Sequence, residues 1–238
     1  MKLGTESIET ALYFIVGEQL SEVFGFFRAY NRHNNFIGRE KELHTLETLF
    51  LKKESSTAHV YGEAGIGKSR IVFEFRNRVS NCNHLVAQCL LENVHNALHP
   101  IINVLKHKYS LDASGNDDAI SRLKCALTDQ DIVKDTIALP ILCAWLNLTL
   151  PDDFNSVILP PKEWKQTLFY TVAYLLFHQE VSELNDGSVF IFEDIHWADP
   201  TSIEFISYLL SSNHFLLSRN IFVSTSRKLI PEPLATKI

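Results

Sequence analysis

The stretch VYGEAGIGKSRIVFEF, residues 60–75, places three glycines and a lysine between two apolar runs. The chain of 238 residues contains only nine glycines, yet Gly62, Gly65 and Gly67 fall within six positions. Glycine in a folded element costs backbone entropy, so such a cluster indicates a backbone that bends unusually or approaches a ligand closely. The stretch therefore predicts a tight loop that is built to hold something.

This loop fits the pattern G-x-x-x-x-G-K-[ST], in which backbone N–H groups surround a phosphate, the lysine reaches the β- and γ-phosphates and the hydroxyl ligates Mg²⁺. The helix that follows directs the positive end of its dipole at the same anion. A glycine-rich turn beside a lysine is the alternative, and rough residue frequencies give this pattern by chance about once in a hundred such chains. We expect phosphate binding by Gly62, Glu63, Ala64, Gly65, Ile66, Gly67, Lys68, Ser69 and Arg70, with the lysine facing solvent in the empty loop.

A phosphate loop needs an acidic partner for its metal, and the run SVFIFED at 188–194 supplies one. Its continuous apolar residues are typical of a central parallel strand that is buried on both faces. Because neighbouring strand residues point to opposite sides, we assign Glu193 to Mg²⁺ together with Ser69, and Asp194 to the attacking water. The usual order of such a pair is Asp then Glu, so the opposite assignment stays open, as does a merely solvated strand end.

The remaining pattern predicts an α/β domain with a mostly parallel sheet and helices on both faces. The region 98–182 reads as mostly helical, and its apolar segment 161–181 is expected to pack against the sheet. Strands are expected at 57–61, 84–90, 188–194 and 220–227, and helices at 39–52, 67–79 and 200–210.

Charge and composition exclude several classes of protein. The net charge of −6 disfavours generic nucleic-acid binding, which needs many cations against phosphates. The longest apolar stretch, 137–150, is shorter than the roughly 20 residues of a membrane span. The N-terminus does not read as a signal peptide, and the four cysteines lack metal or CxxC spacing, so we expect reduced thiols and a cytoplasmic location.

Four motifs carry a family resemblance: FIGREKEL at 36–43, the phosphate loop, FEDIHWADPTS at 192–202 and FVSTSR at 222–227. In this order they resemble the AAA-type signalling ATPases of the STAND class. The chain looks most similar to the origin-recognition-like AAA ATPase domain of large bacterial regulators, where it is fused to class III nucleotide cyclases, serine/threonine kinases or LuxR-type DNA-binding domains. The resemblance covers roughly 34–230 and implies a three-layer P-loop NTPase sheet, ATP and Mg as cofactors, and sensor or effector domains as partners.

Residue by residue, the resemblance implies further contacts with the nucleotide. The family's entry motif, which lies against the adenine and ribose side, matches Phe36, Ile37, Gly38 and Arg39. Arg227, at the end of the last motif, matches a sensor that can touch the γ-phosphate. Arg39 could instead pair with Glu42 at a helix start, and Arg227 could be a surface charge only.

The HWAD residues of the third motif match the family, but no chemistry follows from them. We expect Trp197 to be a packing residue and Asp199 to cap the helix that Pro200 opens. His196 receives no role.

The resemblance also implies a domain organisation. Residues 1–35 form an N-terminal extension, in which 10–18 resemble the last strand of a preceding cyclase domain, and 36–238 form the ATPase domain. We expect the family's further C-terminal strand and helical lid to be absent from this chain. The strand at 57–61 would then be an open edge. We therefore expect self-association and weak ATP binding, unless residues 11–16 cover that edge in part.

The sequence is compatible with several functions. The first is a nucleotide-dependent signalling switch that binds ATP and hydrolyses it slowly. The alternatives are a nucleotide-binding module or truncated relic without turnover, a DNA-associated origin-type ATPase, and a kinase for another substrate. ATP is the default nucleotide because the chain has no Asn-Lys-x-Asp guanine motif.

Overall fold

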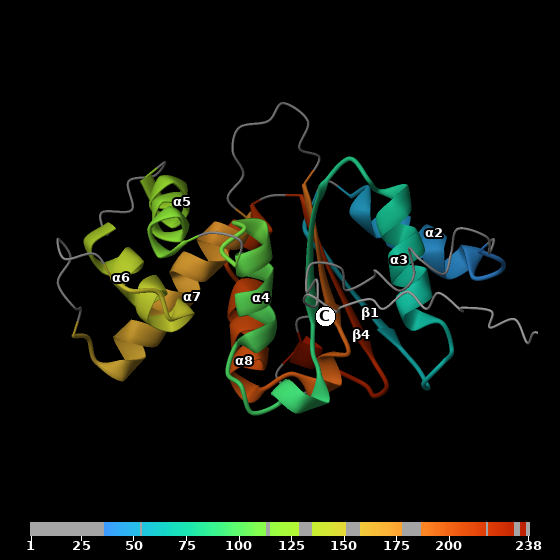
Figure 1. The fold of residues 1–238 in the computed structure, drawn as a ribbon. Coiled ribbons are helices and arrows are strands. Elements are labelled where there is room, and N and C mark those ends of the chain that lie inside the picture. The colour runs from blue at the N-terminus through green and yellow to red at the C-terminus, as the bar shows by residue number, and fades with distance from the viewer. Residues whose placement is uncertain are drawn as a thin grey trace, which may run out of the picture.

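The computed structural model describes residues 36–238 apart from 53, 113–114, 129–134, 151–157, 178–186, 218, 231–233 and 237–238. The strand expected at 11–16 therefore lies outside the described residues. Four strands form one sheet between two layers of helices (Figure 1). The α/β prediction, with helices on both faces of the sheet, is confirmed.

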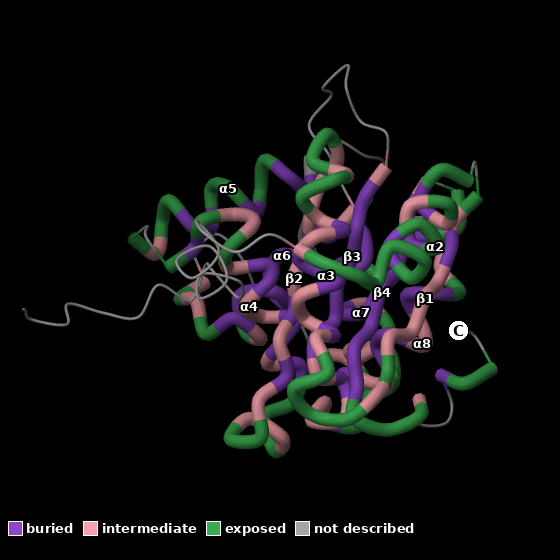
Figure 2. The backbone as a smooth tube through the Cα atoms, turned by 90° about the vertical axis from the view of Figure 1, so that its right-hand side faces the viewer, coloured by how far each residue is buried: buried purple, intermediate pink, exposed green. Residues whose placement is uncertain are grey.

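The sheet is parallel throughout and has the order β1-β4-β3-β2. Its strands are β1 (Ser56–Tyr61), β2 (Asn83–Gln88), β3 (Ser188–Glu193) and β4 (Asn220–Ser226). Every residue of β3 and β4 is buried, as expected for central strands with helices on both sides (Figure 2). β1 and β2 are only partly buried, because within the described residues each pairs on one side alone.

One face of the sheet carries α2 (Glu40–Phe50) and α3 (Lys68–Arg78). The helical spacing of Leu43, Leu46 and Phe50 turns one side of α2 into this layer, where all three are buried. The inward residues predicted for α3 are confirmed, and they join aliphatic side chains of β3 and β4 in one cluster: Ile71, Val72, Phe75, Val189, Ile191, Ile221 and Val223.

The opposite face carries the larger helical layer, and its helices are α4 (His99–Lys108), α5 (Asn116–Thr128), α6 (Asp135–Leu146), α7 (Pro161–Phe177), α8 (Pro200–Leu209) and α9 (Asn213–Leu216). The described residues also include short 3₁₀ turns at Leu91–Asn93, Ile195–Trp197 and Leu234–Thr236. α7 packs mainly on neighbouring helices, and it reaches the sheet where Phe177 meets Phe190 edge-on at 6.3 Å. The expectation that this segment lies against the sheet therefore holds at its C-terminal end. None of the helices in the described ranges is long and apolar enough to cross a bilayer.

Candidate functional site

Three neighbouring parallel strands, β1, β4 and β3, end at the same edge of the sheet, and each leads into a predicted motif. Two hydrogen bonds tie these ends together. The Gly62 N–H, at the end of β1, donates to the Ser226 carbonyl at 3.2 Å. The Asp194 N–H, just past β3, donates to the hydroxyl of Thr225 at 2.9 Å. The glycine loop, the acidic pair and the segment before Arg227 therefore converge at one place.

The glycine loop adopts the unusual backbone that its sequence predicts. Gly62, Gly65 and Gly67 have φ values of 153°, 77° and 97°, in a region that residues with side chains rarely enter. α3 begins directly after the third glycine, at Lys68. The loop therefore leads into a helix N-terminus whose first N–H groups have no partner within the helix, which is the arrangement that binds anions.

Lys68 is not solvent-facing, and that expectation is wrong. Its side chain is buried, with 8% of the residue exposed. The ammonium folds back into its own loop, where it donates to the carbonyls of Gly62 at 3.0 Å and Glu63 at 2.9 Å. When a phosphate binds in this loop, the ammonium would leave these carbonyls and donate to phosphate oxygens instead. This change requires only a short movement of the lysine side chain.

Glu193 ends β3 and is 3% exposed. Burial and the neighbouring Asp194 raise the pKa of its carboxyl to about 7, whereas the hydroxyl of Ser69 and the charge of Lys68 act in the opposite direction. These two influences place the carboxyl beside the start of α3. Among the residues that the structure describes, its buried Oε1 atom has no hydrogen-bond partner. A carboxylate and a hydroxyl side by side are oxygen donors of the kind that Mg²⁺ takes, so the residues present fit the metal.

Asp194 lies beyond the strand, and the alternation argument does not apply to it. Its φ of 51° is left-handed, so a turn rather than strand pleating separates its side chain from that of Glu193. The Asp194 side chain is 32% exposed, and one of its oxygens lies 3.9 Å from Nδ1 of His196. The two acids thus differ in environment, one buried beside the loop and one partly open to water.

Arg227 follows β4 and is exposed. Its positive charge is among the influences that lower the pKa of His196, after burial as the main cause, which puts the guanidinium on the same side of the sheet edge as the acids. Its exposure also fits the alternative of a surface charge, so the sensor role of Arg227 stays a prediction.

Arg70 is the predicted loop residue whose side chain turns elsewhere. Its guanidinium pairs with Glu74 one helical turn later at 2.7 Å, and it lies 5.9 Å from the ring centre of Phe36 and 5.8 Å from that of Phe73. Only its backbone N–H stays with the helix start. Arg70 is better described as a residue that joins the entry segment to α3.

The entry segment 36–39 borders α2 and α3. The Ile37 side chain is 88% exposed, and Gly38 and Arg39 both have positive φ. Arg39 donates to Glu42 at 2.8 Å, which is the alternative pairing that its sequence position left open. In this structure its guanidinium is directed along α2 rather than toward the glycine loop.

The third motif, residues 192–202, also contributes a helix cap and a packing residue next to the site. Asp199 accepts from the N–H groups of Ser202 at 2.9 Å and Leu98 at 3.2 Å, which confirms the predicted cap of α8 and adds a link to α4. Trp197 packs against the larger core, as predicted. Sequence reasoning missed the Thr225 and Leu98 contacts, because their partners are 31 and 101 positions away and no local pattern connects them.

Comparison with known proteins agrees with this geometry. A family model described as AAA ATPase domain matches residues 35–223. An uncharacterized protein of Rhizobium meliloti (strain 1021) is 29% identical over 182 residues, which are 74% of this chain. The match covers 17% of that relative's length.

Proposed function

Because the chain belongs to the AAA ATPase domain family, we propose that it is the nucleotide-binding part of a regulatory ATPase. In this proposal it binds Mg-ATP at the sheet edge, hydrolyses it slowly and signals the state of the nucleotide to neighbouring domains. The observation that carries the proposal is the convergence of the glycine loop, the acidic pair and Arg227 at the ends of β1, β3 and β4.

In this proposal each site residue has one role. The loop N–H groups and the start of α3 bind the phosphates, and the Lys68 ammonium neutralises the β- and γ-phosphate oxygens. Ser69 and Glu193 would hold Mg²⁺, which would supply positive charge against the phosphates. Asp194 is partly exposed, so it can reach a water and orient it toward the γ-phosphate. Arg227 contacts the same phosphate, and Ile37, Gly38 and Arg39 border the base and ribose.

One observation favours the opposite division of labour between the two acids. A carboxyl with a pKa of about 7, as Glu193 has, is matched to proton transfer near neutral pH. In that arrangement Glu193 takes the proton of the water and Asp194 approaches the metal. The site is the same in both cases, and only the phenotypes of the two amide variants change places.

The switch role rests on size and composition. The aligned segment is 17% of the Rhizobium meliloti relative, so the corresponding part of that protein is joined to much more sequence. A small ATPase unit inside a long chain suits a role in which the nucleotide state alters contacts with neighbours. The acidic net charge disfavours nucleic acid as the partner. A cytoplasmic location is part of the same proposal.

The test measures binding and turnover in one sample. The protein is titrated with a fluorescent ATP analogue with and without Mg²⁺, and phosphate release is followed in parallel. We expect Asp194→Asn to retain binding and to lose about 10²-fold in phosphate release, the range for a general base. Glu193→Gln should weaken only the Mg²⁺-dependent part of binding.

Glu204→Gln is the matched control, because Glu204 is an exposed acid of α8 that pairs with Lys165 outside the site. It should change neither signal. Swapped phenotypes of the two site variants would reverse the assignment of metal and water. Absence of ATP binding by the wild-type chain would overturn the proposed function.

A further inference from the structure

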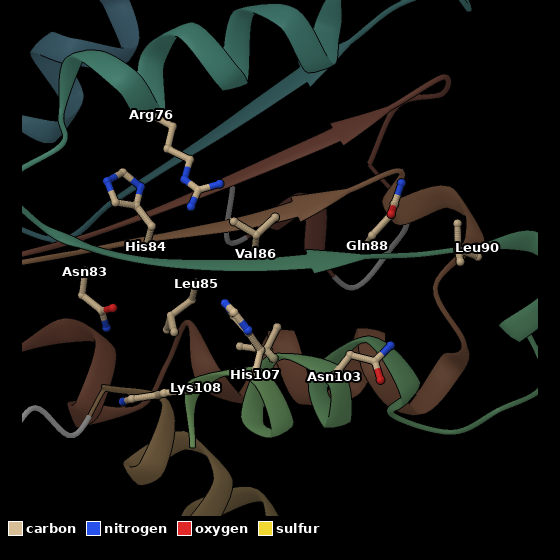
Figure 3. A pocket seen from close by; sticks show the side chains of 11 residues that line it. Arg76, Asn83, His84, Leu85, Val86, Gln88, Leu90, Asn103, His107 and Lys108 are labelled. Carbon is tan, nitrogen blue, oxygen red and sulfur yellow. The ribbon is translucent and has the colours of Figure 1, made fainter. Parts of the chain in front are cut away.

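Away from the phosphate loop, a groove of about 290 Å³ follows the outer edge of β2, between α3 and α4. We call it the β2 groove. Figure 3 shows Arg76 of α3 with His84 and Val86 on one side of the strand, and Asn103, His107 and Lys108 of α4 on the other. The groove therefore straddles the edge of the sheet rather than one of its faces.

The outer edge of β2 directs backbone N–H and C=O groups away from the sheet. The N–H groups of Asn83 and Cys89 donate to Gly187 and Glu193 on the β3 side, at 3.4 Å and 3.0 Å. Alternate residues of a parallel strand direct their N–H and C=O groups to opposite sides. His84, Val86 and Gln88 therefore direct theirs outward, and all three line the β2 groove. Within the described ranges no strand pairs with this edge. Such an edge is a template for one further strand.

The residues that line the groove indicate which kind of strand would fit. Its cationic side chains are those of Arg76 and of Lys108, whose ammonium also donates to the Leu175 and Leu176 carbonyls, and no described residue that lines it carries a carboxylate. Burial lowers the pKa of His84 to about 4, so this imidazole adds no charge at neutral pH. Apolar side chains complete the lining, from Leu85, Val86, Leu90 and Val104. The fitting strand is thus apolar in its centre and acidic at its flanks.

One segment of this chain has that composition. Residues 11–16, ALYFIV, have the pattern of a strand, with Glu6 and Glu9 before them and Glu18 and Glu22 after them. Residues 5–22 contain no lysine or arginine. We propose that residues 11–16 pair with the open edge of β2 and extend the sheet by one strand.

The connection is long enough. Phe36, where the described chain begins, lies against α3, since the Arg70 guanidinium is 5.9 Å from its ring centre. The same helix supplies Arg76 to the β2 groove, six residues or roughly 9 Å farther along its axis. The twenty residues from Val16 to Phe36 can span roughly 60 Å when extended, which is well beyond the distance along that helix. This pairing is independent of nucleotide binding.

Hydrogen–deuterium exchange of the full chain tests the pairing. The amides of His84, Val86 and Gln88 should exchange at least about 10-fold more slowly in the wild type than in the double variant Tyr13→Pro/Phe14→Pro. Neighbouring residues of a strand direct their N–H groups to opposite sides, so one of the two prolines removes a bond to β2 whichever way the strand faces. The double variant Glu6→Pro/Ser7→Pro lies outside the proposed strand and should leave the protection unchanged. A synthetic peptide of residues 5–22, added to Tyr13→Pro/Phe14→Pro, should restore it.

Charge reversal supplies the second arm. Arg76→Glu should weaken the rescue by the peptide, whereas Lys41→Glu, on the exposed side of α2, should not. Equal exchange in wild type and Tyr13→Pro/Phe14→Pro would overturn the proposal. So would rescue by a scrambled peptide of equal charge, or protection of the Thr57, His59 and Tyr61 amides at the β1 edge in place of those of β2.

Discussion

The two faces of the sheet differ in their side chains and in their tasks. On β3, Val189 and Ile191 point toward α2 and α3, whereas Phe190 and Phe192 point toward the larger helical layer. The aliphatic face is small, and its helix α3 carries the phosphate loop at its N-terminus. The aromatic face is large and contributes no proposed ligand of the nucleotide. A parallel strand with two buried faces thus separates the binding side of this domain from the side that mainly stabilises it.

The aromatic face is a connected set of ring contacts. Phe190 meets Phe192 and Phe222 at 5.8 Å each, both edge-on, and Phe169 meets Phe205 at 5.2 Å. Each such pair adds about 0.5–1.5 kcal/mol beyond the burial of its surface. We therefore expect the aromatic face to dominate stability, and the phosphate loop to dominate ligand affinity.

The largest expected effect on ligand binding is that of Lys68→Ala on the affinity for ATP. The ammonium is buried and would lie against the phosphates, and truncation of one member of a buried charge pair costs about 2–5 kcal/mol. The dissociation constant for ATP should therefore rise by about 10²-fold or more in calorimetric titration. Lys41→Ala is the control on exposed α2 surface. An unchanged dissociation constant in Lys68→Ala would show that the phosphate loop does not determine the affinity for ATP.

The second prediction concerns the aromatic face. Phe205 of α8 is fully buried against Phe169, so Phe205→Ala should lower the free energy of unfolding by about 3–5 kcal/mol. Phe205→Leu retains most of the volume and should lose about 1 kcal/mol, the ring contact alone. Denaturant unfolding measures both. Neither variant should change the ATP affinity of the folded protein. A parallel loss of affinity would show that the two faces do not have separate roles.

The third prediction uses pH. In the folded state the pKa of Glu193 is about 7, above its ordinary value of 4.5, so the folded chain holds the extra proton between these values. The free energy of unfolding should therefore fall as pH rises from 4.5 to 7, by about 3 kcal/mol from this group. Melting curves in Mg²⁺-free buffer at several pH values measure this. Glu193→Gln should lack this part of the pH dependence and should be more stable than wild type at pH 8. Parallel curves for the two proteins would show that the carboxyl is not buried as described.

The smallest predicted effect lies within the larger helical layer, at the cap of α8. Asp199→Ala removes the acceptor for the Ser202 and Leu98 N–H groups, and we expect a loss of about 2 kcal/mol. Ser212→Ala, at the cap of the four-residue helix α9, should lose only about 0.5 kcal/mol. Chemical denaturation of both variants compares them. Equal losses would mean that the Leu98 contact does not help to join α4 and α8.

The sequence was informative where a local pattern has one physical solution. The three glycines predicted a left-handed loop, the apolar run at 188–193 predicted a buried central strand, and Asp199 before Pro200 predicted a helix cap. Each of these features depends on neighbours within a few residues. All three lie within residues 35–223, which match the AAA ATPase domain family.

The sequence was uninformative where distant segments meet. That Lys68 folds onto the Gly62 and Glu63 carbonyls depends on the closed shape of the loop, not on its composition. No glycine marks the turn at Asp194 in the sequence. This turn replaces the strand alternation from which the metal and water roles of the two acids were assigned. The groove beside β2 arises from α3, β2 and α4 together, and no short stretch of sequence shows it.

The central claim is that nucleotide binding belongs to the phosphate loop and stability to the aromatic face. Thermal unfolding with and without Mg-ATP, on wild type, Phe205→Leu and Lys68→Ala, tests it most directly. At a hundred times the wild-type dissociation constant, Mg-ATP should stabilise wild type and Phe205→Leu equally, by about 2.7 kcal/mol, and Lys68→Ala hardly at all. Equal stabilisation of Lys68→Ala, or loss of the effect in Phe205→Leu, would contradict the claim.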